Sequence, residues 1–339
     1  MVAVEQNKLI RFINASYGIV GTHSAVQICS WTKKALRGQG VCYKQKFYGI
    51  DCHRCAQMSP AFAWCHQSCS HCWRPSEWMV KNTFKEKDVD EPEKIIEETV
   101  KQRRRLICGI GGAADVSKQL FDESYNKFPS HWAISLSGEP TIYPKIGELI
   151  QRLRKQKEVR SVFLVTNGQE PQRIAHMAKR GQLPTQLYVS ITAPNEVQFK
   201  KLNKSIYTDG WERLITTLNM LKKLKCRTVV RLTHIRKIND NEKAIKEFAE
   251  LLEKAQPHFI EIKGYVFIGL SRMRLRKEYM PLRTDVVELS KKLLAVLPPY
   301  SHEGTDVNSR VVLLKNKKRR MDTLIVKKKK RPMCNRKQL

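Results

Sequence analysis

The sequence contains no long hydrophobic run. No stretch of about 18 apolar residues occurs, so we expect no transmembrane helix and no membrane partner. The N-terminal stretch MVAVEQNKLIRFIN has no apolar core followed by a small-residue cleavage site, which argues against secretion. Nothing in the sequence demands an oligomer either. We therefore expect a monomeric, cytoplasmic protein.

Acidic residues are scarce. The chain has 63 Lys and Arg residues but 32 Asp and Glu residues, which leaves a formal charge of +31. A surplus of this size favours a polyanionic partner, and nucleic acid is the default candidate. Residues 315–339 contain twelve Lys or Arg and one acid, Asp322, so we expect this run to stay loose until phosphates neutralise it. Arg103, Arg104 and Arg105 are further expected phosphate contacts.

Ten cysteines are present, but they are not distributed as in a secreted disulfide protein. Seven lie between Cys29 and Cys72, and the other three are scattered at Cys108, Cys226 and Cys334. A chain of this length without an export signal is typical of a reducing compartment. The clustered cysteines therefore indicate metal binding.

A dinucleotide-binding turn is also missing, because no GxGxxG sequence follows a first strand. From residue 91 onwards, helical patterns alternate with short apolar runs such as HWAISLSG, SVFLVTNG and LYVSITAP. This alternation predicts βαβ units and a parallel sheet. Polar or glycine-containing sequences follow the apolar runs, at the strand ends where an α/β barrel has its active site. We expect three parts: residues 1–60 with a capped helix over 21–40, a barrel over 61–300, and a basic tail over 301–339.

Three cysteines lie within the stretch WCHQSCSHCW: Cys65, Cys69 and Cys72. Structural zinc sites need four ligands, commonly in paired CxxC or CxxC and HxxxH units. Here His66 and His71 would have to complete the site from within the same loop, which disfavours zinc. Three thiolates on a four-iron cluster instead leave one iron without a protein ligand, and chemistry at a metal requires such an open position.

The CxxxCxxC spacing resembles the signature of the radical S-adenosylmethionine (radical SAM) enzymes. In those enzymes S-adenosylmethionine chelates the open iron, and its reductive cleavage gives methionine and a 5′-deoxyadenosyl radical. The SGEP sequence at 137–140 resembles the family's GGEP element, with serine in place of the first glycine. The runs TNG and LYVSITAP also match positions that contact the cofactor. The resemblance implies that S-adenosylmethionine is bound by Ser137, Gly138, Glu139, Asn167 and Ser190.

Three further cysteines, Cys29, Cys42 and Cys55, follow one another with twelve residues between neighbours. Free thiols pack well as small apolar groups, so an inert structural role is one explanation. Three thiols so near the first group favour a second four-iron cluster, again with an open iron. Cys52 forms a CxxC pair with Cys55 and is the rival ligand. The choice of Cys55 rests on the equal spacing and on the resemblance described next.

The stretch CYKQKFYGIDCHRCAQMSP, with the cysteine-rich loop after it, resembles the tRNA 4-demethylwyosine synthases of wyosine and wybutosine biosynthesis. The resemblance covers essentially the whole chain and is sharpest from Cys29 to Trp73. It implies an α/β fold: a partial (β/α)6 radical-SAM barrel with an N-terminal helical, cluster-binding extension. It also implies S-adenosylmethionine and two [4Fe-4S] clusters, the second of which binds pyruvate. The chain starts too close to the motif for the flavodoxin-like domain of eukaryotic members, so we expect the archaeal type with an external electron donor.

The resemblance further implies the substrate, tRNA(Phe) with N1-methylguanosine beside the anticodon. Its N1-methyl carbon would add to the carbonyl carbon of pyruvate, with loss of the carboxyl carbon, to give 4-demethylwyosine. Lys44 matches the family lysine proposed to form a Schiff base with pyruvate, which requires a lowered pKa. Trp73, Trp78 and Tyr48 are either stacking platforms for the base or core residues. Two alternatives stay open: another radical SAM enzyme that modifies RNA, such as a methylthiotransferase, and a non-catalytic iron–sulfur RNA-binding protein.

Overall fold

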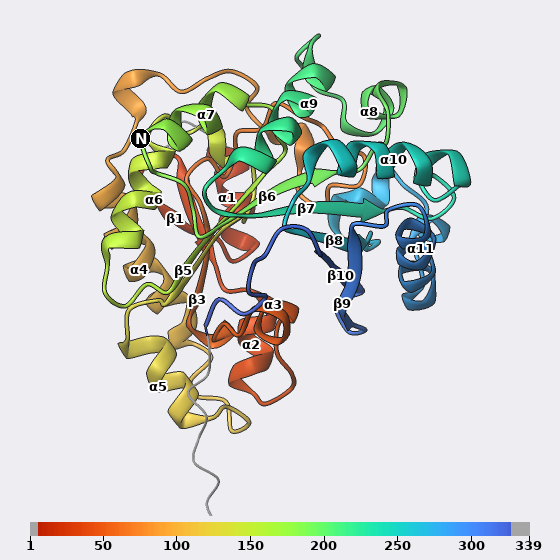
Figure 1. The fold of residues 1–339 in the computed structure, drawn as a ribbon. Coiled ribbons are helices and arrows are strands. Elements are labelled where there is room, and N and C mark those ends of the chain that lie inside the picture. The colour runs from red at the N-terminus through yellow and green to blue at the C-terminus, as the bar shows by residue number, and fades with distance from the viewer. Residues whose placement is uncertain (1–5, 327–339) are drawn as a thin grey trace, which may run out of the picture.

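The structure, a computed structural model, describes residues 6–326 (Figure 1). Its centre is one sheet of ten strands in the order β1-β2-β3-β4-β5-β6-β7-β8-β10-β9. Strands β3 to β8 run parallel to one another, and antiparallel strands extend the sheet at both sides. The strands are β1 (Gly18–Val20), β2 (Ser24–Gln27), β3 (Cys55–Ser59), β4 (His131–Ile134), β5 (Ser161–Thr166), β6 (Gln186–Ile191), β7 (Arg227–His234), β8 (Phe259–Gly264), β9 (Tyr300–Asp306) and β10 (Val311–Asn316).

Helices alternate with the parallel strands, so the mixed α/β fold with a parallel sheet is confirmed. None of the helices in the described part of the chain is long and apolar enough to cross a membrane. The α-helices are α1 (Gln6–Asn14), α2 (Ser30–Leu36), α3 (Tyr43–Tyr48), α4 (Pro92–Cys108), α5 (Lys118–Asn126), α6 (Ile146–Lys155), α7 (Pro171–Lys179), α8 (Glu196–Asn203), α9 (Gly210–Met220), α10 (Glu242–Ala255) and α11 (Arg283–Ala295).

The two faces of the sheet contact different partners, because successive strand residues point to opposite sides. Leu164 on β5 and Leu187 on β6 pack with α4, α6, α7, α9, α10 and α11 in the largest apolar cluster. Figure 1 shows these helices around the outside of the strands. Phe163 and Tyr188, one position away, pack instead with Tyr48 of α3. We call this second side the inner face, and the N-terminal segment covers it.

The N-terminal segment differs from expectation. The helix expected over residues 21–40 is wrong, because Ser24–Gln27 forms strand β2 and only Ser30–Leu36 is helical. Burial of Ser24, Ala25 and Val26 between β1 and β3 stabilises the strand in preference to a helix. The segment expected to be helical therefore also supplies three strands of the sheet, β1, β2 and β3.

The C-terminal region also differs. Residues 300–316 form the hairpin β9–β10, which pairs with β8, so this part of the expected tail is folded. The apolar run VVLL of β10 is fully buried and drives this pairing. Residues up to 326 pack back onto the N-terminal segment: the Ile325 N–H donates to the Tyr48 carbonyl at 2.9 Å. Only residues 327–339 of the expected loose tail lie outside the described residues.

Candidate active site

The first cysteine group lies in the loop after β3, at the carboxyl ends of the parallel strands. Arg274, from the segment after β8, donates hydrogen bonds to the carbonyl oxygens of Cys69 (2.8 Å) and Cys72 (2.7 Å). The Cys65 N–H donates to the Val80 carbonyl at 3.2 Å. These bonds fix the loop through its backbone, and all three cysteine residues are partly exposed.

Side-chain amides lie near the sulfur atoms of this first cysteine group. Asn167 Nδ2 lies 3.9 Å from Cys65 Sγ, and Asn203 Nδ2 lies 3.7 Å from Cys69 Sγ. The buried Gln67 Nε2 has no hydrogen-bond partner among residues 6–326. Buried donors normally have partners, and the sulfurs of an iron–sulfur cluster accept hydrogen bonds. Three thiols with donors around them therefore fit a four-iron cluster.

The surroundings do not favour zinc. His66, one of the two histidines that would complete a zinc site, uses Nδ1 to contact Glu170 (3.1 Å) and the Tyr207 hydroxyl (2.8 Å). Within the part of the chain that the structure describes, no three His, Cys, Asp or Glu side chains converge on a point where a single metal ion could bind. Zinc binding through His66 Nδ1 would require the loss of both of these contacts.

The SGEP turn after β4 lies directly against the cysteine loop. The Glu139 N–H donates to the Trp64 carbonyl at 2.6 Å. Gly138 has φ +68°, and a Cβ there would lie 1.9 Å from the Ala61 carbonyl oxygen. Only glycine permits this approach. Ser137 is buried beside it, at 5% exposure, so the turn presents mainly its backbone to the loop.

The Glu139 carboxylate links the segment after β4 to the end of β5 by hydrogen bonds. It is 2% exposed and accepts hydrogen bonds from Thr141 N (3.0 Å), Thr166 Oγ1 (2.8 Å) and Asn167 N (2.7 Å). Burial raises the pKa of this carboxyl, although each of these bonds lowers it. Glu139 therefore positions Asn167, whose side chain approaches the first cysteine group.

The second cysteine group comes from three segments. Cys29 directly precedes α2, Cys42 directly precedes α3, and Cys55 begins β3. Burial raises the pKa of the Cys55 thiol to about 12; among nearby groups Lys44 lowers it, whereas the Cys29 and Cys42 thiols raise it. The fold thus brings the three thiols near one another. Cys52 also lies near Cys29 and Cys42, and it is 2% exposed whereas the other three residues are partly exposed.

Lys44 lies on α3 and points into the inner face. It is 8% exposed, and Nζ lies 4.3 Å from the centre of the Phe163 ring and 4.8 Å from that of Tyr188. Burial lowers the pKa of this amine, and the nearby Arg231 lowers it further. Because only a neutral amine attacks a carbonyl, this environment suits a nucleophilic lysine.

Charged residues that the sequence reasoning missed surround Lys44. Glu261 on β8 is fully buried and accepts hydrogen bonds from Tyr48 OH (2.7 Å), Tyr188 OH (3.0 Å) and Arg231 Nη2 (3.0 Å). Burial acts to raise the pKa of Glu261, but Arg231 and Lys44 hold it below its usual value. In the sequence, Glu261 and Lys263 are the single acid and the single lysine within the apolar run HFIEIKGYVFIG. This pattern could have indicated them as functional residues.

The inner face also carries partly exposed polar residues near the carboxyl ends of the strands. Ser190 on β6 and Arg231 on β7 are register partners, and both are partly exposed. Lys263 on β8 is partly exposed as well, and burial followed by the charge of Arg231 lowers its pKa to about 8. Ser190 thus faces the same side of the sheet as Lys44 and the other basic groups.

Comparison with known proteins identifies the family. Residues 60–251 match the radical SAM superfamily, and residues 254–316 match the wyosine base formation family. The S-adenosyl-L-methionine-dependent tRNA 4-demethylwyosine synthase of Pyrococcus abyssi is 44% identical over 303 residues, which cover 89% of this chain and 86% of that protein. The chain belongs to the tRNA 4-demethylwyosine synthase family.

Solved structures of the synthase family agree along 95% of the chain. A structure of TYW1 with a lysine–pyruvate adduct bound has a TM-score of 0.83 at 35% identity, covering 95% of this chain and 99% of that one. A crystal structure of archaeal TYW1 has a TM-score of 0.75 at 33% identity with the same coverage. The present synthase is therefore of the archaeal type. It is a radical SAM enzyme that uses S-adenosylmethionine and a [4Fe-4S] cluster.

Among the aromatic and basic residues considered as tRNA contacts of this synthase, the structure distinguishes exposed from buried side chains. Tyr48 is fully buried and Trp78 is partly buried, whereas Trp73, next to Cys72, is 45% exposed. The expected phosphate contact at Arg103 is wrong. Its guanidinium is 1% exposed and donates to the carbonyl oxygens of Cys55, His53 and Ser124, because α4 packs against β3 there.

Proposed function

We propose that this synthase condenses N1-methylguanosine, beside the anticodon of tRNA(Phe), with pyruvate to form 4-demethylwyosine. The observation that carries the proposal is Lys44, a buried amine of lowered pKa beside the second cysteine group. When bound at Cys65, Cys69 and Cys72, the cluster and S-adenosylmethionine supply a hydrogen-abstracting radical. The residues of this chain bind and orient the two substrates.

The inner face carries a surplus of positive charge, which suits the carboxylate of a keto acid. Three cations, Lys44, Arg231 and Lys263, lie near one acid, Glu261. The surplus of positive charge favours an anionic ligand such as pyruvate. Lys44, once neutral, attacks the keto carbon, and loss of water gives an imine whose formation fixes the substrate covalently. We assign a second [4Fe-4S] cluster to Cys29, Cys42 and Cys55, where an open iron would hold the carboxylate side of the same molecule.

Reductive trapping tests the role of Lys44. Anaerobic incubation with pyruvate and cyanoborohydride reduces an imine to a stable secondary amine, which peptide mass spectrometry locates. We expect the mass increase on Lys44 and none in Lys44→Ala. Lys46→Ala is the matched control, because Lys46 lies on the same helix but is 46% exposed and paired with Asp306. Labelling of Lys46 or Lys263 instead of Lys44 would contradict the assignment.

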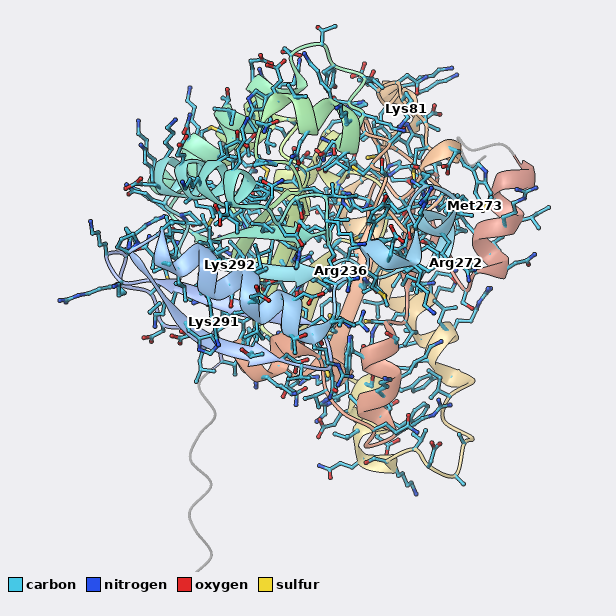
Figure 2. The ribbon with its side chains drawn as sticks, turned by 90° about the vertical axis from the view of Figure 1, so that its right-hand side faces the viewer. Lys81, Arg236, Arg272, Met273, Lys291 and Lys292 are labelled. Carbon is cyan, nitrogen blue, oxygen red and sulfur yellow. The ribbon has the colours of Figure 1, made fainter. Side chains whose placement is uncertain are left out.

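We further propose that tRNA approaches the carboxyl ends of the strands. Figure 2 shows Lys81, Arg236, Arg272 and Met273 on one side of the molecule. These residues follow β3, β7 and β8, and Met273 is 82% exposed. Basic groups would contact phosphates, and exposed Trp73 would stack on an unpaired base.

The cellular setting is part of the proposal. In residues 6–326 every cysteine is free, as a reducing compartment requires. We infer a monomeric, cytoplasmic enzyme that receives electrons from a separate donor.

A further inference from the structure

Arg74 is a buried cation between the two cysteine groups. It follows Cys72 by two residues, is 6% exposed, and has no carboxylate partner within residues 6–326. Its guanidinium donates to the Tyr17 hydroxyl and to Gln27 Oε1 (3.3 Å), and it lies 3.6 Å from the centre of the Trp73 ring. Its buried Nε has no hydrogen-bond partner among the described residues.

This side chain links the two segments that carry the cysteines. Gln27 ends β2 and lies two residues before Cys29, so one hydrogen bond joins the chain beyond Cys72 to the chain before Cys29. Arg74 thus lies two residues after Cys72 and is hydrogen-bonded to the residue two positions before Cys29, which places one guanidinium beside both cysteine segments.

Three other cations near the cysteines do not combine the absence of an ion-pair partner within residues 6–326 with contacts to both cysteine segments. Arg274 forms an ion pair with Glu77 at 3.3 Å, and Arg231 forms one with Glu261. Lys81 donates to the Gln67 carbonyl and the Ser68 hydroxyl, both in the loop of the first group. Within residues 6–326, neither Arg74 nor Lys81 has an ion-pair partner, but of these four cations only Arg74 contacts both Gln27, before Cys29, and Trp73, beside Cys72.

We propose that Arg74 is a shared counter-charge that raises the reduction potentials of both clusters. The inference rests on the proposed function, because it requires the second cluster. A buried cation without an anionic partner is costly, and two thiolate-bound clusters would supply the missing negative charge. Each cluster becomes more negative by one charge when it accepts one electron from the external donor. A nearby cation stabilises that reduced state, and charge near a cluster is one determinant of its potential.

Redox titration tests the proposal. Full-length protein, reconstituted anaerobically with iron and sulfide, is titrated with dithionite and followed by electron paramagnetic resonance. We expect Arg74→Gln to shift the midpoint potentials of both clusters downward, and Arg74→Lys to retain most of the wild-type values. Lys81→Gln is the control, because Lys81 contacts only the first loop and should leave the second cluster's potential unchanged.

A second variant keeps the test decisive if Arg74→Gln fails to take up iron. Gln27→Glu places a carboxylate beside Arg74 and neutralises it without removing it, so both potentials should again fall. Two clusters with unchanged potentials in these variants, or a shift of one cluster alone, would overturn the shared role and leave the proposed function standing. A wild-type protein with a single cluster would overturn both.

Discussion

The buried network around Glu261 allows a quantitative prediction for Glu261→Gln. The carboxylate is fully buried and is the ion-pair partner of Arg231, which is itself only 16% exposed. An amide removes the negative charge and cannot accept every hydrogen bond from Tyr48, Tyr188 and Arg231. Breaking a buried pair on one side costs about 3–5 kcal/mol, because the remaining charge is left uncompensated.

Urea unfolding of the metal-free protein, followed by tryptophan fluorescence, measures this loss. Glu93→Gln is the control, because Glu93 pairs with Arg152 on the surface, where the side chains are 47% and 57% exposed. Loss of such an exposed pair costs about 0.2–1 kcal/mol. If Glu261→Gln costs no more than Glu93→Gln, the network is not the stabilising element described here.

The same variant has a second consequence, for Lys44. Glu261 raises the pKa of Lys44, opposing the effects of burial and of Arg231. Its loss therefore lowers this pKa further, so more of the amine is neutral at a given pH. The pH profile of pyruvate trapping on Lys44 should move to lower pH in Glu261→Gln. A profile that moves to higher pH, or stays in place, would refute the assigned electrostatics.

Four further predictions follow from the site and the core. Gly138→Ala forces a left-handed residue to carry a Cβ against the Ala61 carbonyl, a strain of at least about 1–2 kcal/mol, and calorimetry should show weakened S-adenosylmethionine binding. Trp73→Ala should weaken binding of an anticodon stem-loop by about 1–3 kcal/mol in a filter-binding assay, whereas partly buried Trp78→Phe should not. His131 is held neutral by burial, which lowers its pKa to about 3, so urea midpoints should fall as pH drops below about 6.5. Deletion of residues 327–339 should flatten the salt dependence of tRNA binding.

Local patterns in the sequence predicted the parallel sheet and the first cysteine group. The apolar runs of β4 to β8 are buried on both faces and alternate with amphipathic helices, a signal contained within each segment. The spacing of Cys65, Cys69 and Cys72 is likewise local. The placement of Gly138 against the same loop also agrees with the family motif.

Contacts between distant segments could not be predicted in this way. Tyr43 and Glu261 form a hydrogen bond although they are 218 residues apart in the sequence, and no local sequence pattern predicts this contact. Arg103 was expected at the surface because it lies in a basic run, yet its position on the buried side of α4 places it against Cys55. Strand β2 was missed because its four residues form a strand only between β1 and β3.

The most direct test of the proposed function is product formation with labelled pyruvate. The reconstituted enzyme, S-adenosylmethionine, dithionite and tRNA(Phe) bearing N1-methylguanosine are incubated with pyruvate labelled either at the keto carbon or at the carboxyl carbon. Nucleoside mass spectrometry should detect 4-demethylwyosine that carries the keto-carbon label and lacks the carboxyl label, with none formed by Lys44→Ala. Cleavage of S-adenosylmethionine without any labelled nucleoside, or the same product from Lys44→Ala, would contradict the account.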